Sequence, residues 1–141
     1  MALPKQKFRE LVFQILFSNH FLKEKVEEDL GFYMEQLKTT RKNVEEAYAV
    51  VSKVVELKPK LDEEIAKLST SYEVDRIQSV EMNILRLCVY ELVFEKEVPP
   101  EILITEGIRL AKKFSTKESL TFINAILDRL YKNNQDHVYN A

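Results

Sequence analysis

The segment KQKFRELVFQILF, residues 5–17, decides the class of fold. On a helical wheel its apolar side chains cover most of the circumference: Phe8, Leu11, Val12, Phe13, Ile15, Leu16 and Phe17. The polar side chains form one narrow wedge: Lys7, Glu10, Gln14 and Ser18. A helix that is apolar nearly all round is typical of the middle of a bundle. Because proline suits a first helical turn, we expect this helix to run from Pro4 to about Ser18, in a central position.

The composition indicates an all-α protein. The chain has 141 residues, enough for one domain of ordinary size with a continuous core. It contains only 2 glycines and 4 prolines, so there are too few turn formers for a β-sandwich.

The charges are nearly balanced, with 21 Lys and Arg against 23 Asp and Glu. A global basic field is therefore absent, and any nucleic-acid site must be local. Cys88 is the single cysteine and can form no internal disulfide, and the first ten residues lack the apolar run of a signal peptide. The longest apolar stretch, ILRLCVYELVF, contains Arg86 and Glu91 and is too short to cross a bilayer. These features predict a soluble cytoplasmic protein.

Helical periodicity continues through the rest of the chain. A second helix is expected at roughly 25–38, with Phe32, Met34 and Leu37 as candidate core residues. A long helical pattern from Val44 to Leu68 should kink or break at Pro59, which removes a backbone donor.

The second half is predicted to hold three or four more helices. Asp75 is a plausible N-cap for a helix, or two short ones, that reaches about Lys96 and ends at the two following prolines. The last two helices are expected at roughly 100–114 and 117–133, and QDHVYNA (135–141) should be a frayed tail.

The residue patterns of common enzymes and metal sites are missing. The sequence has no Gly-rich phosphate loop, no HExxH and no CxxC, and neither His20 nor His137 has metal-ligand spacing. Cys88 lies in the apolar arc of its helix, which favours a buried inert thiol. Glu91 shares that arc and should be buried or nearly so, in a structural rather than a catalytic role. We therefore expect no enzyme, no metal and no cofactor.

Three motifs carry a resemblance to a known family. ILRLCVYEL (84–92), PPEILITEGIRLAKKF (99–114) and ESLTFINAILDRL (118–130) resemble, in order and spacing, the C-terminal half of the NusB family of bacterial transcription antitermination factors. Residues 5–17 resemble the basic first helix of the family. This chain differs at Thr105, where the family prefers Asn, at Gly107, where it prefers Ala, and at Ala125, where it prefers Gly. Its N-terminal run, residues 5–9, also contains fewer arginines and bulkier residues than the corresponding run of the family.

The resemblance implies a fold and a function. The fold has an N-terminal bundle of three helices (about 1–72) and a C-terminal bundle of four (about 73–141), packed around the first helix. The implied function is binding of the single-stranded boxA element of nascent RNA, jointly with NusE, a small-subunit ribosomal protein. This complex helps hold the RNA on the elongating RNA polymerase, mainly for ribosomal RNA operons.

The resemblance also implies site residues. Phe122 lies off the apolar stripe of its helix, and the matching position in the family faces RNA, so Phe122 is expected to stack on an unpaired base. Glu118, one turn away, is expected to accept hydrogen bonds from a base. The RNA-binding candidates at the positive end of the first helix are Lys5, Gln6, Lys7 and Arg9. Glu81, in the stretch QSVEMN that we expect to be acidic and exposed, is a candidate contact for the partner protein.

Other interpretations remain open. Phe122 could pack at the edge of the core, the basic residues could be a solvated helix start, and Glu118 could simply suit the dipole of its own helix. The chain could also be a helical protein–protein adaptor that binds no RNA. A third hypothesis makes it a stand-alone relative of the NusB-like domain of ribosomal RNA methyltransferases, although no βαβ segment or cofactor loop follows.

Overall fold

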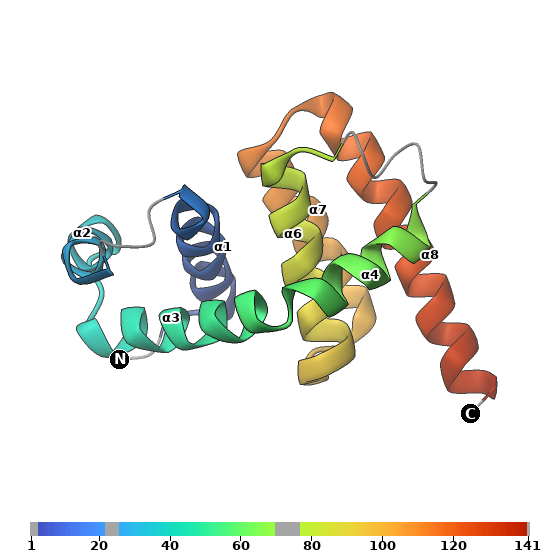
Figure 1. Cartoon of the computed structure of the whole chain (residues 1–141), viewed down its shortest axis with the longest axis horizontal. Helices are drawn as coiled ribbons and strands as arrows, with labels where there is room; N and C mark the ends of the chain where they lie inside the picture. The colour runs from blue at the N-terminus through green and yellow to red at the C-terminus, as the bar shows by residue number, and fades with distance from the viewer. Residues whose placement is uncertain (1–2, 22–25, 70–76, 141) are drawn as a thin grey trace. The chain divides into compact units, whose positions relative to one another are not determined.

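The computed structural model describes residues 3–21, 26–69 and 77–140, and within these ranges the chain is helical and has no strand. Seven α-helices and one π-helix are present in the described part (Figure 1). The chain divides into two compact units, Met1–Glu56 and Leu57–Ala141. The prediction of an all-α fold is confirmed.

The first unit contains α1 (Lys5–Phe21), α2 (Val26–Leu37) and α3 (Arg41–Glu56). Helix α3 packs against both α1 and α2. Five of the seven apolar residues predicted for α1 are buried, and Phe8 and Phe17 are half-buried. The core of this unit includes Leu11, Ile15, Leu30, Tyr33, Val44, Ala47, Val51 and Val54. The apolar pattern of residues 5–17 therefore correctly predicted a helix with most of its apolar side chains buried.

Helix α2 buries a different face from the one predicted. Phe32, a predicted core residue, is 58% exposed, so that prediction is wrong. Leu30 and Tyr33 are buried instead, and the Tyr33 hydroxyl donates a hydrogen bond to the Ser18 hydroxyl of α1 at 3.1 Å. The two buried residues are three apart and share a face, and Phe32, about 100° away from Tyr33 on the helix, falls outside it.

The end of α2 is closed by a Schellman motif. The Thr39 N–H donates to the Met34 carbonyl at 3.0 Å, and the Lys38 N–H donates to the Glu35 carbonyl at 3.3 Å. This pattern needs a left-handed residue at Lys38, whose φ is 49°. A lysine therefore occupies a position that favours glycine.

The helical pattern of residues 44–68 is interrupted as predicted. Helix α3 ends at Glu56, and α4 (Lys58–Leu68) begins after the single residue Leu57. Pro59 lies in the first turn of α4, where its missing N–H has no intrahelical partner to lose.

The second unit contains α4, α6 (Ser79–Val89), the π-helix η1 (Tyr90–Glu95), α7 (Pro100–Phe114) and α8 (Lys117–Asn140). Helix α6 packs against α4, α7 and α8, and α7 packs against α8. Within the described residues, the first unit contains three α-helices and the second contains four, beside η1. The predicted N-cap, Asp75, lies outside the described residues.

Helix α4 belongs to the second unit, whereas the sequence analysis placed the division at about residue 72. Two sets of polar contacts attach it there. The Arg86 guanidinium of α6 binds both carboxylate oxygens of Asp62, at 2.7 and 3.1 Å. The Arg129 guanidinium of α8 donates to the carbonyl of Leu68, the last residue of α4, at 2.7 Å.

Helix α6 continues into the wider π-turn of η1, which sequence periodicity did not predict. The turn closes with the Lys96 N–H donating to the Glu91 carbonyl at 2.8 Å, and Lys96 is left-handed with a φ of 58°. Glu91, which was expected to be buried or nearly so, is half-buried and lies within this π-helix. Cys88 itself is buried, as predicted.

Helix α7 approaches its neighbours closely at Gly107. A Cβ added to Gly107 would lie 2.7 Å from the Leu127 Cδ1 atom of α8 and 2.9 Å from the Cys88 Sγ atom of α6. Both distances are shorter than a normal carbon contact. The lack of a side chain at Gly107 therefore lets α6 and α8 pack against α7.

The last helix is longer than predicted. The expected end was about residue 133 with a frayed tail beyond it, but the α8 backbone remains helical to Asn140. In the parts of the chain that the structure describes, we find no helix with the length and apolar character needed to cross a membrane.

Candidate nucleic-acid interface

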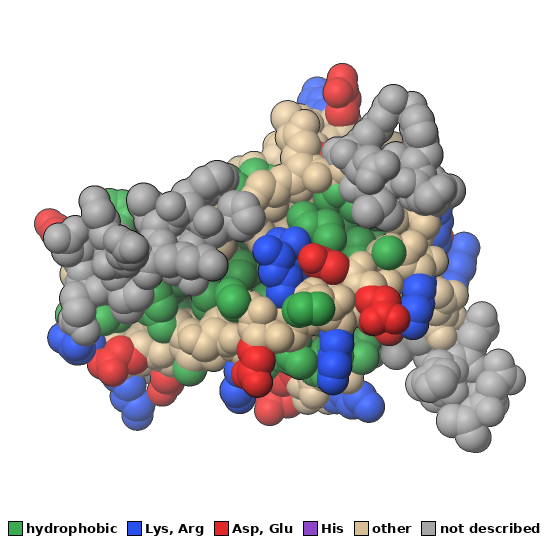
Figure 2. Space-filling view, in the orientation of Figure 1, with side chains coloured by type: hydrophobic (Ala, Val, Ile, Leu, Met, Phe, Trp, Pro, Cys, Tyr) green, Lys and Arg blue, Asp and Glu red, His purple; other side chains and the backbone are tan. Residues whose placement is uncertain are grey.

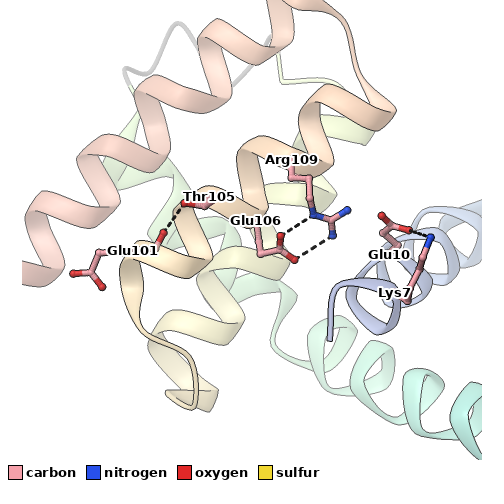
Figure 3. Close-up of polar contacts among 6 residues, drawn as sticks. All are labelled: Lys7, Glu10, Glu101, Thr105, Glu106 and Arg109. Atoms are coloured by element: carbon pink, nitrogen blue, oxygen red, sulfur yellow. Dashed lines mark hydrogen bonds and ion pairs between the residues drawn. The ribbon is translucent and has the colours of Figure 1, made fainter. Parts of the chain in front are cut away.

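The start of α1 presents three of the four predicted RNA-binding side chains to solvent. Lys5, Gln6 and Lys7 are exposed. The first turn contains no acidic residue, and the N–H groups of a first turn have no intrahelical acceptor. The Lys7 ammonium lies 4.0 Å from the Glu10 carboxylate, a distance typical of a weak pair (Figure 3). This helix end can therefore accept an anion such as a phosphate.

The fourth residue, Arg9, is placed differently. Arg9 is 7% exposed, and Glu10, which was expected in the polar wedge, is 6% exposed. Because Arg9 is buried, its side chain is not exposed to solvent as those of Lys5 and Lys7 are. The candidate phosphate contacts on α1 are therefore Lys5 and Lys7, with Gln6 between them.

The start of α8 presents the predicted base-contacting pair. Glu118 is exposed and Phe122 is half-buried. They lie one helical turn apart and therefore on one face. A half-buried ring has one part packed on the protein and another part open to solvent. The position of Phe122 is thus compatible with both packing and base stacking.

Local hydrogen bonds hold the first turn of α8. Thr116 precedes the helix, and its hydroxyl accepts the Ser119 N–H at 3.2 Å. The Thr116 carbonyl accepts the Leu120 N–H at 2.9 Å. Thr116 is therefore the N-cap of α8, and it determines where Glu118 and Phe122 begin their helical turn.

Three lysines beside this pair were missed by the sequence analysis. Lys112 and Lys113 lie in the last turn of α7, Lys117 lies in the first turn of α8, and all three are exposed. Only Ser115 and Thr116 separate the two helices, so the lysines cluster at this end of the helix pair. The signal was present in the run AKKFSTK, residues 111–117.

On the face shown in Figure 2, basic and acidic side chains are interspersed. This pattern agrees with the net charge of −2 and with the expectation that a nucleic-acid site must be local. Helix α7 also contains an internal pair, in which Arg109 donates to both carboxylate oxygens of Glu106, at 2.7 and 3.1 Å (Figure 3).

Glu81, the predicted partner contact, is not an exposed acid. Its side chain is 6% exposed, and its Oε2 atom accepts the Gln78 N–H at 3.2 Å. Its Oε1 atom accepts a hydrogen bond from the Ser119 hydroxyl of α8. The expectation of an exposed carboxylate here is corrected, because this carboxylate joins two helix starts.

Comparison with known proteins identifies the family. A family model described as "NusB family" matches residues 6–132. The transcription antitermination protein NusB of Trichlorobacter lovleyi is 34% identical over 126 residues, which cover 89% of each chain. The protein of the same name from Thermotoga sp. is 34% identical over 132 residues, covering 94% of this chain and 93% of the relative.

Solved structures show the same fold. The T. maritima NusB structure aligns with a TM-score of 0.76 and 32% identity, covering 94% of this chain and 93% of that one. A crystal structure of the antitermination factors NusB and NusE in complex with dsRNA aligns with a TM-score of 0.74 and 27% identity, covering 92% and 96%.

Proposed function

This chain belongs to the NusB family, and on that premise we propose that it is an RNA-binding transcription antitermination factor. It binds a single-stranded boxA-type element in nascent ribosomal RNA together with a NusE-type ribosomal protein. The complex holds that RNA on the elongating RNA polymerase in the cytoplasm. No catalytic reaction is part of this function.

The observation that carries the proposal is the arrangement at the start of α8. An exposed carboxylate, Glu118, lies one turn from a partly open aromatic ring, Phe122, and three exposed lysines lie where α7 ends and α8 begins. Unpaired bases stack on aromatic rings and are read by polar side chains on their edges, and lysines neutralise the adjoining phosphates. An acid among lysines suits selective recognition of a base, because it can accept hydrogen bonds from a base amino or imino group.

Helix α1 supplies further phosphate contacts in this proposal. Lys5 and Lys7 provide charge and Gln6 provides a neutral polar side chain, at the N-terminal end of the helix, where the dipole favours an anion. Arg9 was predicted to act with them, but its burial makes it a poor first choice for substitution. A test of phosphate binding therefore starts with Lys5 and Lys7.

The partner is proposed from the relative that was solved with NusE and RNA. We place its binding surface on the second unit, as the sequence analysis did, near the start of α6. Glu81 remains a candidate contact there, but its carboxylate is occupied within the chain. A change of Glu81 to lysine would therefore disturb α6 and α8 as well as any partner.

Fluorescence anisotropy with a short boxA-type RNA, in the presence of the NusE-type partner, tests the proposal. If about three phosphates are neutralised, log affinity should fall against log salt with a slope near −2, by the single-strand rule of about −0.7 per phosphate. Lys5→Ala or Lys7→Ala should each flatten that slope by roughly 0.7. An unrelated single strand and a duplex of the same sequence serve as competitors, which measure selectivity for sequence and for strandedness.

Variants of Phe122 separate stacking from packing. Phe122→Ala should cost about 1–3 kcal/mol of binding with the salt slope nearly unchanged, because stacking releases few counterions. Phe122→Leu retains apolar volume without an aromatic face, whereas Phe122→Tyr retains the face. We expect the tyrosine variant to bind well and the leucine variant to bind poorly, and Thr121→Ala, at an exposed neighbour, to behave like the parent.

Circular dichroism must show that each variant is folded. If folded Phe122→Ala binds the RNA as well as the parent does, Phe122 only packs and the proposed base contact is wrong. If the parent binds the partner but no RNA, the adaptor hypothesis replaces this one.

A further inference from the structure

We infer that Glu81 is a positioning residue, which fixes the start of α8 and thereby the direction of Glu118 and Phe122. The consequence for RNA rests on the proposed function, but the positioning itself is a property of the free chain. Glu81 belongs to α6, and it acts on the RNA-facing pair through Ser119, which lies between Glu118 and Phe122 in the sequence.

The contacts form a chain from one helix start to the other. One carboxylate oxygen of Glu81 accepts the Gln78 N–H at 3.2 Å, so the side chain caps the first turn of its own helix. The other oxygen accepts the Ser119 hydroxyl of α8. The Ser119 N–H in turn donates to the Thr116 hydroxyl at 3.2 Å, and the two hydroxyl oxygens are 3.1 Å apart. One carboxylate therefore serves the N-termini of two helices.

The environment of Glu81 makes this contact stronger than a surface hydrogen bond. The side chain is 6% exposed, so water competes little for its oxygens. Hydrogen bonds to an ionised acceptor are roughly twice as strong as neutral ones. The carboxylate also lies at the N-terminal ends of two helices, α6 and α8.

The position of Ser119 explains why the contact should affect recognition. Ser119 lies in the first turn of α8, directly after Glu118 and three residues before Phe122. Without the contact to α6, the first turn keeps only its Thr116 cap, and helix ends open more readily than helix middles. If the first turn is loosened, the Glu118 side chain should adopt a wider range of orientations. Phe122, which lies one turn further along the helix, should move less. Selectivity for the base that Glu118 contacts should therefore suffer more than overall affinity.

Hydrogen exchange on the free chain tests the positioning directly. Ser119→Ala should speed amide exchange in residues 119–122 by roughly tenfold, the effect of losing one hydrogen bond to a charged group. Ser119→Thr retains the hydroxyl and should restore slow exchange. The double variant Glu81→Ala with Ser119→Ala should exchange no faster there than Glu81→Ala alone, because both changes remove the same contact. Thr121→Ala, on the same helix, is the matched control and should leave exchange unchanged.

RNA and partner binding then separate this inference from its alternatives. Ser119→Ala should reduce the preference for boxA-type RNA over an RNA with one altered base, while the salt slope and partner association stay at parental values. If Glu81→Gln weakens partner association while Ser119→Ala leaves both exchange and base preference unchanged, Glu81 is a direct partner contact and the inference is wrong. If the parent binds no RNA, the proposed function fails, and the exchange experiment still decides whether Glu81 positions α8.

Discussion

Replacing glycine by alanine should affect the stability of this protein differently at its two glycines, because the backbone at Gly107 lies close to neighbouring side chains and that at Gly31 does not. Both glycines of the chain lie inside helices, Gly31 in α2 and Gly107 in α7. A Cβ added at Gly31 meets no atom within 4 Å, whereas at Gly107 it lies 2.7 Å from Leu127 Cδ1 and 2.9 Å from Cys88 Sγ. Alanine should therefore stabilise the protein at the first site and destabilise it, or at best leave it unchanged, at the second.

The magnitudes follow from two opposing effects. Alanine is favoured over glycine in a helix interior by up to about 1 kcal/mol, so Gly31→Ala should raise the free energy of unfolding by about 0.5–1 kcal/mol. Adding a methyl group to a packed core costs about 1–3 kcal/mol. After subtraction of the helix preference, Gly107→Ala should lower the free energy of unfolding by about 0–2 kcal/mol. The two variants should thus differ by about 1–3 kcal/mol.

Urea denaturation followed by circular dichroism measures both changes, with constant m-values as the check that only stability has changed. Cys88→Ala removes one of the two close atoms. Cys88→Ala should therefore lower the free energy of unfolding less in the Gly107→Ala background than in the parent, a coupling expected between residues in contact. If Gly107→Ala raises stability as much as Gly31→Ala does, the packing of α7 against α6 and α8 is not tight at this point and the reasoning fails.

Two further predictions concern the ends of helices. Lys38→Gly should raise the free energy of unfolding by about 1 kcal/mol, because a left-handed backbone strains a residue with a Cβ. Lys42→Gly, in the first turn of α3, should instead lower the free energy of unfolding in the same urea assay. Burial, then the negative charges of Glu95, Glu91 and Glu97, raise the pKa of Tyr90 above its ordinary value of 10.0. The protonated hydroxyl therefore stabilises the fold fully below about pH 10, and this stabilisation is lost as the pH rises through the folded pKa. Tyr90→Phe cannot titrate there, so its free energy of unfolding should fall less steeply at alkaline pH than that of the parent. Equal pH dependence in both proteins would contradict this.

Features governed by local sequence were predicted well. The apolar circumference of residues 5–17 identified α1, and the chemistry of Pro59 identified the break between α3 and α4. Both depend on residues within one or two helical turns, so a wheel or a single backbone rule is enough. The lysines at the end of α7 could have been recognised in the same way, from the run AKKFSTK.

Features governed by contacts between distant segments were not predicted. Which face of α2 is buried depends on how α3 approaches it, so Phe32 could not be distinguished from Tyr33 by periodicity. The role of Glu81 depends on Ser119, 38 residues later in the chain. A carboxylate in a first helical turn is ordinarily a solvated acid, and only the packing of α6 against α8 turns this one inward.

The attachment of α4 to α8 has a consequence for the order of events during synthesis. The first unit is complete once residue 56 has been made, and domains generally fold as units from the N-terminus during translation. The second unit begins with α4, but the Leu68 carbonyl finds its partner only when Arg129 emerges, 61 residues later. At about 5–20 residues per second, the Leu68 carbonyl waits for seconds until this partner has been made. A nascent chain therefore carries a finished first unit and an open second one for much of its synthesis.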